Sequence, residues 1–114
     1  KFSILGSGGV GQTIADVLLK MATVIFLCLI GDKKIDALQL TGPERFKGKT
    51  VIDLTNPLDF SKGFPPSIPG NYKDRSLAEA IQEVLPGAFV VKALNTLTAK
   101  LMMEPAAVNG GDHD

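Results

Sequence analysis

Apolar residues along the chain follow two patterns, short continuous runs and runs at helical spacing. Continuous runs predict strands over residues 2–5, 23–30, 49–54 and 88–94, and the run over 23–30 is typical of a strand buried on both faces. Between them, apolar residues at helical spacing predict helices over residues 9–21, 76–85 and 96–103, and a short helix between Asp32 and Thr41. This alternation predicts an α/β fold with a mainly parallel sheet and helices on both faces.

Two features mark the ends of these elements. Ser76 and Glu79 have the spacing of a capping box, in which each side chain bonds the other's backbone N–H, and Pro86-Gly87 ends the helix that they start. Residues 58–75 contain three prolines and two glycines and have no helical or strand period. Loops of this length in a compact domain are usually functional or mobile.

A glycine-rich segment, Gly6-Ser7-Gly8-Gly9-Val10-Gly11, lies between the first predicted strand and the first predicted helix. In a dinucleotide-binding turn, Gly6 allows the sharp bend, Gly8 lets a pyrophosphate approach the backbone, and Gly11 lets the helix pack on the strand. The helix N-terminus then offers unpaired N–H groups to the phosphates. A glycine-rich turn without a ligand is the alternative.

The carboxyl ends of the other predicted strands carry polar residues at the same edge of the sheet. They are Gly31-Asp32, Asn56-Pro57 and Asn95-Thr96. Ligands of parallel sheets bind beyond this edge, so Asn56 and Asn95 are candidates to hydrogen-bond a ribose, a nicotinamide amide or a second ligand. Alternatively, both asparagines only cap turns.

Composition argues against two classes of protein, those that bind nucleic acids and those with membrane-spanning helices. The 114 residues suit one domain, and 12 basic residues balance 12 acidic ones, which argues against nucleic-acid binding. No apolar run reaches the roughly 20 residues that a membrane helix needs. The one cysteine, Cys28, is predicted to be a small core residue; since it has no disulfide partner, we expect a cytoplasmic protein.

Catalytic and metal-binding patterns are weak. The one histidine, His113, lies between Asp112 and Asp114, a trio that suits a solvated turn better than a metal site, so no metal is predicted. No nucleophile motif occurs, and Asp53, inside a predicted strand, is expected to orient a loop rather than to act as an acid. No catalytic residue is assigned. Phe60 and Phe64 are expected either to stack on a planar acceptor ring or to pack their loop on the body.

Three segments resemble the NADP-dependent, deazaflavin (coenzyme F-420) reductase-like oxidoreductases. They are Ile4 to Thr13, Val51 to Leu58 and Val90 to Thr96. The Asp-x-Thr-Asn-Pro and Lys-Ala-x-Asn-Thr patterns in the last two are more specific than the glycine motif. The resemblance implies a Rossmann-type, doubly wound parallel sheet that binds NADP(H). It also implies hydride transfer to a planar acceptor such as a deazaflavin or flavin, and a homodimer.

The resemblance assigns site residues by position. It implies phosphate binding by Gly6, Ser7, Gly8, Gly9, Val10 and Gly11. It implies contacts near the nicotinamide by Ile30, Gly31, Asn56, Pro57, Ala93 and Asn95.

Two departures from the family pattern predict an incomplete sheet. Relatives have another strand and helix, a repeat of roughly 30 residues, between the first helix and the run over 23–30, so a segment is expected to be missing near Lys20–Met21. Relatives also continue with further structure beyond the position of Asp114. Residues 1–114 are therefore expected to form a fragment, or a gapped version, of an NAD(P)-binding Rossmann domain.

Two alternative functions remain open at this point. Asp32 lies about 20 residues after Gly11, where NAD-selective folds place the acidic residue that binds the ribose 2′-hydroxyl, which suits an NAD-dependent dehydrogenase. In that case Asp32→Ala relaxes a preference for NAD over NADP, whereas under the family interpretation Asp32 only caps a helix. A dinucleotide-binding sensor without catalysis is the second alternative, since the same fold serves both.

Overall fold

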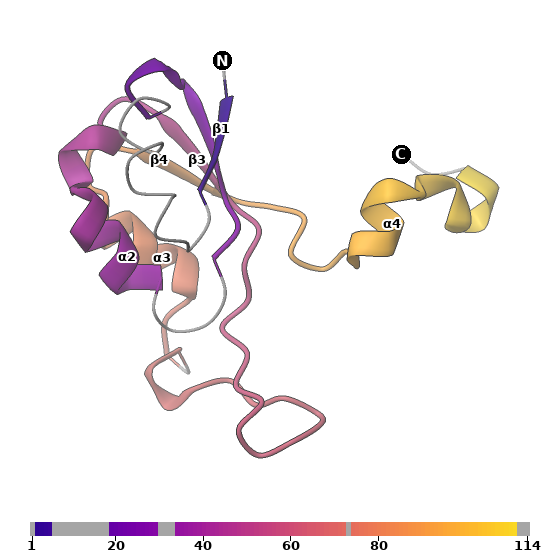
Figure 1. The fold of residues 1–114 in the computed structure, drawn as a ribbon. Helices are drawn as coiled ribbons and strands as arrows, with labels where there is room; N and C mark the ends of the chain where they lie inside the picture. The colour runs from indigo at the N-terminus through magenta and orange to yellow at the C-terminus, as the bar shows by residue number, and fades with distance from the viewer. Residues whose placement is uncertain (1, 6–18, 30–33, 73, 112–114) are drawn as a thin grey trace.

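Four short strands form a parallel sheet in the computed structural model, which describes residues 2–5, 19–29, 34–72 and 74–111. They are β1 (Phe2–Leu5), β2 (Val24–Leu27), β3 (Thr50–Asp53) and β4 (Phe89–Lys92), and they lie side by side in the order β1-β2-β3-β4 (Figure 1). The register pairs Ile25 with Val51 and Val51 with Val90. The predicted parallel sheet is confirmed as a partial Rossmann-like fold, with strands shorter than the apolar runs that predicted them.

Three helices follow the sheet strands in the described part of the chain. They are α2 (Lys34–Thr41), α3 (Leu77–Val84) and α4 (Ala99–Met103), and residues 19–21 form the end of another helix. Single 3-10 turns occupy Pro43–Phe46, Gly70–Tyr72, Pro105–Ala107 and Asn109–Gly111. Among the described helices, none is both long and apolar enough to span a membrane.

The core lies between one face of the sheet and helices α2 and α3. Ile25 and Leu27 of β2 and Val51 of β3 are fully buried, and they pack in one cluster with Leu38 of α2 and Ile81 of α3. Figure 1 shows α2 and α3 side by side on the same side of the sheet. One layer of helices thus buries every second residue of β2 and β3.

The opposite face of the sheet is apolar and only partly covered. Val24 and Phe26 are half-buried, and Phe89 and Val91 of β4 are 65% and 46% exposed. Helices on both faces were expected, but the described helices that contact the sheet cover one face. The strand order explains this. When each new strand is added on the same side of the previous one, right-handed connections place all the connecting helices on one face of the sheet.

Helix α3 begins with the predicted capping box. The Glu79 backbone N–H donates to Ser76 Oγ at 3.2 Å, and the Ser76 N–H donates to Glu79 Oε2 at 2.6 Å. The hydrogen bond from the Ser76 backbone lowers the pKa of the Glu79 carboxyl below its ordinary value. With the helix start fixed, Leu77, Ile81 and Leu85 all reach the core.

Helix α4 lies apart from the sheet. Figure 1 shows it beyond the segment that follows β4, away from α2 and α3. Thr98 caps its start by accepting a hydrogen bond from the Leu101 N–H at 3.3 Å, and the helix ends just before Pro105, as expected. Met103 is 80% exposed, so α4 contributes little to the core.

Replacing Ser76 with alanine removes the cap of α3 and should lower the free energy of unfolding by about 1 kcal/mol, as loss of such caps typically does. Urea denaturation followed by circular dichroism measures this change. Ser67→Ala is the matched control, because Ser67 bonds Asp59 only through its backbone N–H and carbonyl. Equal stability of the two variants would show that the cap does not stabilise α3.

Candidate functional site

A buried carboxylate, Asp53, ends strand β3. It is fully buried, and its Oδ1 accepts hydrogen bonds from the Thr55 backbone N–H at 3.0 Å and from Thr55 Oγ1 at 2.6 Å. Its Oδ2 accepts from Lys92 Nζ at 2.9 Å, and the same ammonium also donates to the Thr55 carbonyl. Asp53 therefore shapes the turn after β3 and ties it to the end of β4, which confirms its expected role in orienting a loop.

Two asparagines meet just beyond these strand ends. Asn56 Nδ2 donates to the Asn95 backbone carbonyl at 2.7 Å, and Asn95 Nδ2 donates to Asn56 Oδ1 at 3.2 Å. The bonds join residues 39 positions apart, so these side chains link the two loops rather than only capping their own turns. Their predicted meeting at one edge of the sheet is confirmed.

The chain reaches Asn95 through a strained residue. Leu94 has a φ of 60°, a left-handed conformation that costs a residue with a Cβ roughly 1–2 kcal/mol. This turn brings Asn95 back towards Asn56 immediately after β4. Strain of this kind is retained where the surrounding contacts hold it, here the asparagine pair and the Asp53–Lys92 ion pair.

A buried lysine contacts the same loop from α2. Lys34 is 1% exposed, and its Nζ donates to the Asn56 backbone carbonyl at 3.0 Å. It stands in the sequence beside another lysine at the start of a short helix, a position typical of solvated residues, and the sequence analysis did not select it. No local pattern reveals a contact to a residue 22 positions away.

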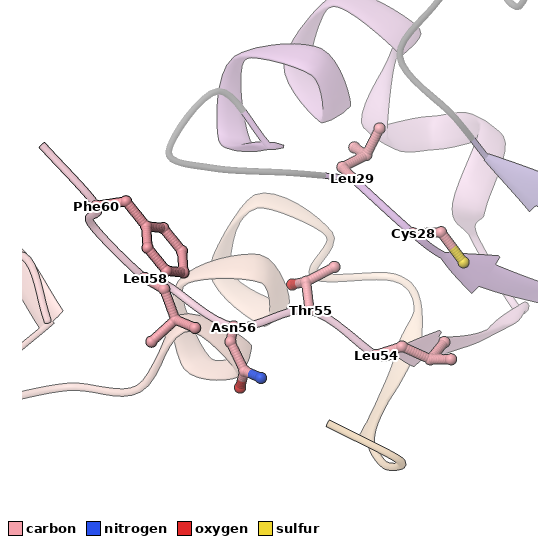
Figure 2. Close-up of a pocket in the computed structure, with 7 residues that line it drawn as sticks. All are labelled: Cys28, Leu29, Leu54, Thr55, Asn56, Leu58 and Phe60. Atoms are coloured by element: carbon pink, nitrogen blue, oxygen red, sulfur yellow. The ribbon is translucent and has the colours of Figure 1, made fainter. Parts of the chain in front are cut away.

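Among the described residues, a first pocket at this edge lies between the ends of β2 and β3. It has a volume of about 370 Å³ and is lined by Cys28, Leu29, Leu54, Thr55, Asn56, Leu58 and Phe60. Figure 2 shows Cys28 and Leu29 at the end of β2, and the residues from Leu54 to Phe60 along the segment that follows β3. A cavity of this size lies at the lower end of the range for small-molecule sites and suits one ring system.

The predicted core position of Cys28 is wrong. It was expected in the core, but it is exposed at the wall of the first pocket, because β2 ends at Leu27 and the residue after it faces away from the buried cluster. Partial burial, with the negative charge of Asp53 second, raises the pKa of the Cys28 thiol. The thiol thus stays protonated at neutral pH and presents a neutral surface to the pocket.

The second pocket lies on the other side of Asn56, between the ends of β3 and β4 and the start of α3. It has a volume of about 360 Å³ and is lined by Asn56, Pro57, Ile68, Tyr72, Ser76, Leu77, Ala78, Lys92 and Asn95. Apolar side chains from the loop and α3 combine here with the ammonium of Lys92 and two amides. Asn56 lines both pockets and forms a wall that they share.

A solved structure matches nearly the whole chain. It is the crystal structure of a protein from Arthrobacter sp. FB24 assigned as an F-420-dependent NADP-reductase, with 32% sequence identity and a TM-score of 0.79, and the match covers 99% of this chain and 70% of that chain. The chain belongs to the deazaflavin (coenzyme F-420)-dependent NADP-reductase family. The predicted resemblance is thereby confirmed. No protein-family model and no curated protein sequence matches the chain.

The site residues expected from the reductase family fall into two groups. Those outside the described residues are Gly6, Ser7, Gly8, Gly9, Val10, Gly11, Ile30 and Gly31, together with Asp32. Asn56, Pro57 and Asn95 are described and come together around the second pocket. Ala93 lies beside them, and its N–H donates to the Asp53 carbonyl at 3.2 Å. Nucleotide binding by either group remains a prediction.

The proline-rich loop that follows Pro57 is folded back on itself. Asp59 and Ser67 exchange backbone hydrogen bonds of 2.9 and 3.0 Å, and Asp59 Oδ1 accepts from the Ser61 N–H. Phe60 lines the first pocket, whereas Phe64 is 90% exposed. Packing on the body is therefore wrong for Phe64, and stacking on an acceptor ring remains a prediction for both residues.

Metal ligands were not expected, and His113 with its two aspartates lies outside the described residues. Within the described ranges, no group of three or more His, Cys, Asp or Glu side chains is arranged to hold a metal ion. The described polar groups at the carboxyl edge include instead the amides of Asn56 and Asn95, the ammonium groups of Lys34 and Lys92, and the buried carboxylate of Asp53.

Replacing Lys92 with methionine leaves the buried Asp53 carboxylate without its cation and should cost roughly 3 kcal/mol of unfolding free energy. The loss is measured by urea denaturation. Arg75→Met is the control, since it breaks a 2.7 Å ion pair with Glu83 whose side chains are 41% and 67% exposed. We expect that change to cost less than about 1 kcal/mol. Equal losses would mean that Asp53 does not depend on Lys92.

Proposed function

We propose that the chain is an NADP-dependent oxidoreductase that passes a hydride between the nicotinamide and a planar acceptor such as a deazaflavin or flavin. Residues 1–114 would act as one dinucleotide-binding domain. The observation that carries the proposal is the pair of ring-sized pockets that share Asn56 at the carboxyl edge of the sheet. The assigned activity of the Arthrobacter protein supports the same class of reaction.

The order of the strands suggests which ligand takes which pocket. The glycine-rich segment follows β1, the first pocket lies between β2 and β3, and the second lies between β3 and β4. A dinucleotide whose pyrophosphate is held after β1 reaches the first pocket with its nicotinamide end. The acceptor then takes the second pocket, where Lys92 and Asn95 offer N–H groups to ring carbonyl oxygens.

Hydride transfer demands little acid–base chemistry from the chain. When bound, NADPH would supply a hydride to a ring atom of the acceptor, a carbon in a deazaflavin or a nitrogen in a flavin, and would leave as NADP⁺, while solvent would supply the accompanying proton. Positioning of the two rings within van der Waals reach supplies most of the acceleration. The described polar groups suit that role, since the Asn56–Asn95 pair is held by hydrogen bonds on both sides.

Assembly and compartment are part of the proposal. The partly exposed apolar face of the sheet, with Phe89 and Val91, supports association into a homodimer, because large exposed apolar patches are typical of interfaces. The one cysteine has no partner in the sequence, which supports a reducing cytoplasm.

The proposal is tested by titrating the protein with NADPH, NADP⁺ and NADH in a calorimeter. Turnover is followed through the loss of reduced-nicotinamide absorbance with coenzyme F-420, FMN and ferric acceptors. We expect tighter binding of NADPH than of NADH, and turnover with a planar acceptor. Binding without turnover would favour a dinucleotide sensor, and the absence of binding would overturn both hypotheses.

Phe60→Ala should raise the KM for NADPH several-fold while Phe64→Ala leaves it unchanged, because only Phe60 lines the pocket assigned to the nicotinamide. The two variants remove the same ring from the same loop, so effects of general hydrophobicity cancel. Steady-state kinetics at saturating acceptor give the comparison. An equal effect of the two changes would contradict the assignment of this pocket.

A further inference from the structure

We infer that Lys34 is a positioning residue for the hydride-transfer site, acting through the backbone of Asn56. The expected effect on catalysis rests on the proposed function. The claim that Lys34 positions Asn56 does not depend on it. It concerns a residue that the family resemblance did not select.

The burial of Lys34 is the first step. Its side chain is 1% exposed and is among the largest fully buried side chains of the described residues. An ammonium group is costly to bury unless it has hydrogen-bond partners, so its position is dictated by the acceptors that it reaches. The Asn56 carbonyl, 3.0 Å from Nζ, is such an acceptor.

The second step is what this contact holds in place. Lys34 opens helix α2, and Asn56 lies in the loop after β3, so the bond ties the first turn of the helix to that loop. The Asn56 side chain in turn bonds both the backbone and the side chain of Asn95. Lys34, Asn56 and Asn95 therefore form one chain of hydrogen bonds from α2 to the end of β4.

The third step is the relation to the two pockets. Asn56 lines both, and Lys34 lines neither. A shift of the Asn56 backbone moves the residue at which the two pockets meet and leaves their other lining residues in place. The turn itself keeps its own support, because Asp53 still bonds Thr55 and Lys92. Loss of Lys34 should thus alter ring placement more than it alters the fold.

Lys49 offers a matched control at the opposite end of the sheet. Its Nζ donates to the Ala22 backbone carbonyl at 2.7 Å, a lysine-to-carbonyl bond across 27 positions. Ala22 and Lys49 come just before β2 and β3, far along the strands from the carboxyl edge. Lys49→Met removes the same kind of bond without touching the site.

The experiment compares Lys34→Met, Lys34→Arg and Lys49→Met with the original protein. Side-chain amide signals of Asn56 and Asn95 are followed by NMR, and kcat and KM for NADPH and the acceptor are measured separately. For Lys34→Met we expect shifted or broadened signals of both amides and a fall in kcat of about tenfold or more, since small misplacements of reacting groups are costly. The Lys34→Arg variant keeps a hydrogen-bond donor, so its amide signals and its kcat should lie close to those of the original protein.

Each outcome decides the inference. Unmoved amide signals in Lys34→Met, or equal kinetic losses in Lys34→Met and Lys49→Met, would overturn it. If the original protein shows no turnover, the proposed function fails, and the NMR comparison alone still tests whether Lys34 positions Asn56. If Lys34→Met does not fold, Lys34→Gln, which is too short to reach the Asn56 carbonyl, replaces it in the same comparison.

Discussion

The carboxyl edge of the sheet depends on the buried carboxylate of Asp53. A charge removed from water in this way persists only where it is paired and fully hydrogen-bonded. Thr55 and Lys92 supply those partners, and they come from the turn after β3 and from the end of β4. Satisfying one buried charge therefore forces two loops, separated by the whole of α3, into a fixed relation.

That relation allows the asparagine pair to form. Once Lys92 is held against Asp53, the chain has only Ala93 and Leu94 in which to turn back before Asn95, and Leu94 adopts the left-handed conformation that the short connection requires. The strain at Leu94 is offset by the hydrogen bonds that Asn95 then makes with Asn56. The shared wall of the two pockets is thus a consequence of the ion pair behind it.

The sequence predicts well those features that depend on neighbouring residues. The capping box at Ser76 and Glu79 and the presence of strands β3 and β4, though not their exact ends, follow from local patterns. The meeting of Asn56 with Asn95 follows from the rule that parallel strands end at one edge. Features that depend on tertiary packing are not predicted in this way. Where each strand or loop turns decides the exposure of Cys28, the burial of Lys34 and the difference between Phe60 and Phe64. The local spacing of apolar residues does not predict these turns.

The one-sided cover of the sheet follows from its winding. A doubly wound sheet reverses direction at a switch point, and only that reversal sends later helices to the second face. In the order β1-β2-β3-β4 the described strands never reverse, so none of the described helices that contact the sheet covers the face that carries Phe89 and Val91. The contacts among Lys34, Asp53, Asn56, Lys92 and Asn95 involve none of this face. The hydrogen-bonded site and the uncovered surface are therefore separate consequences of the same strand order.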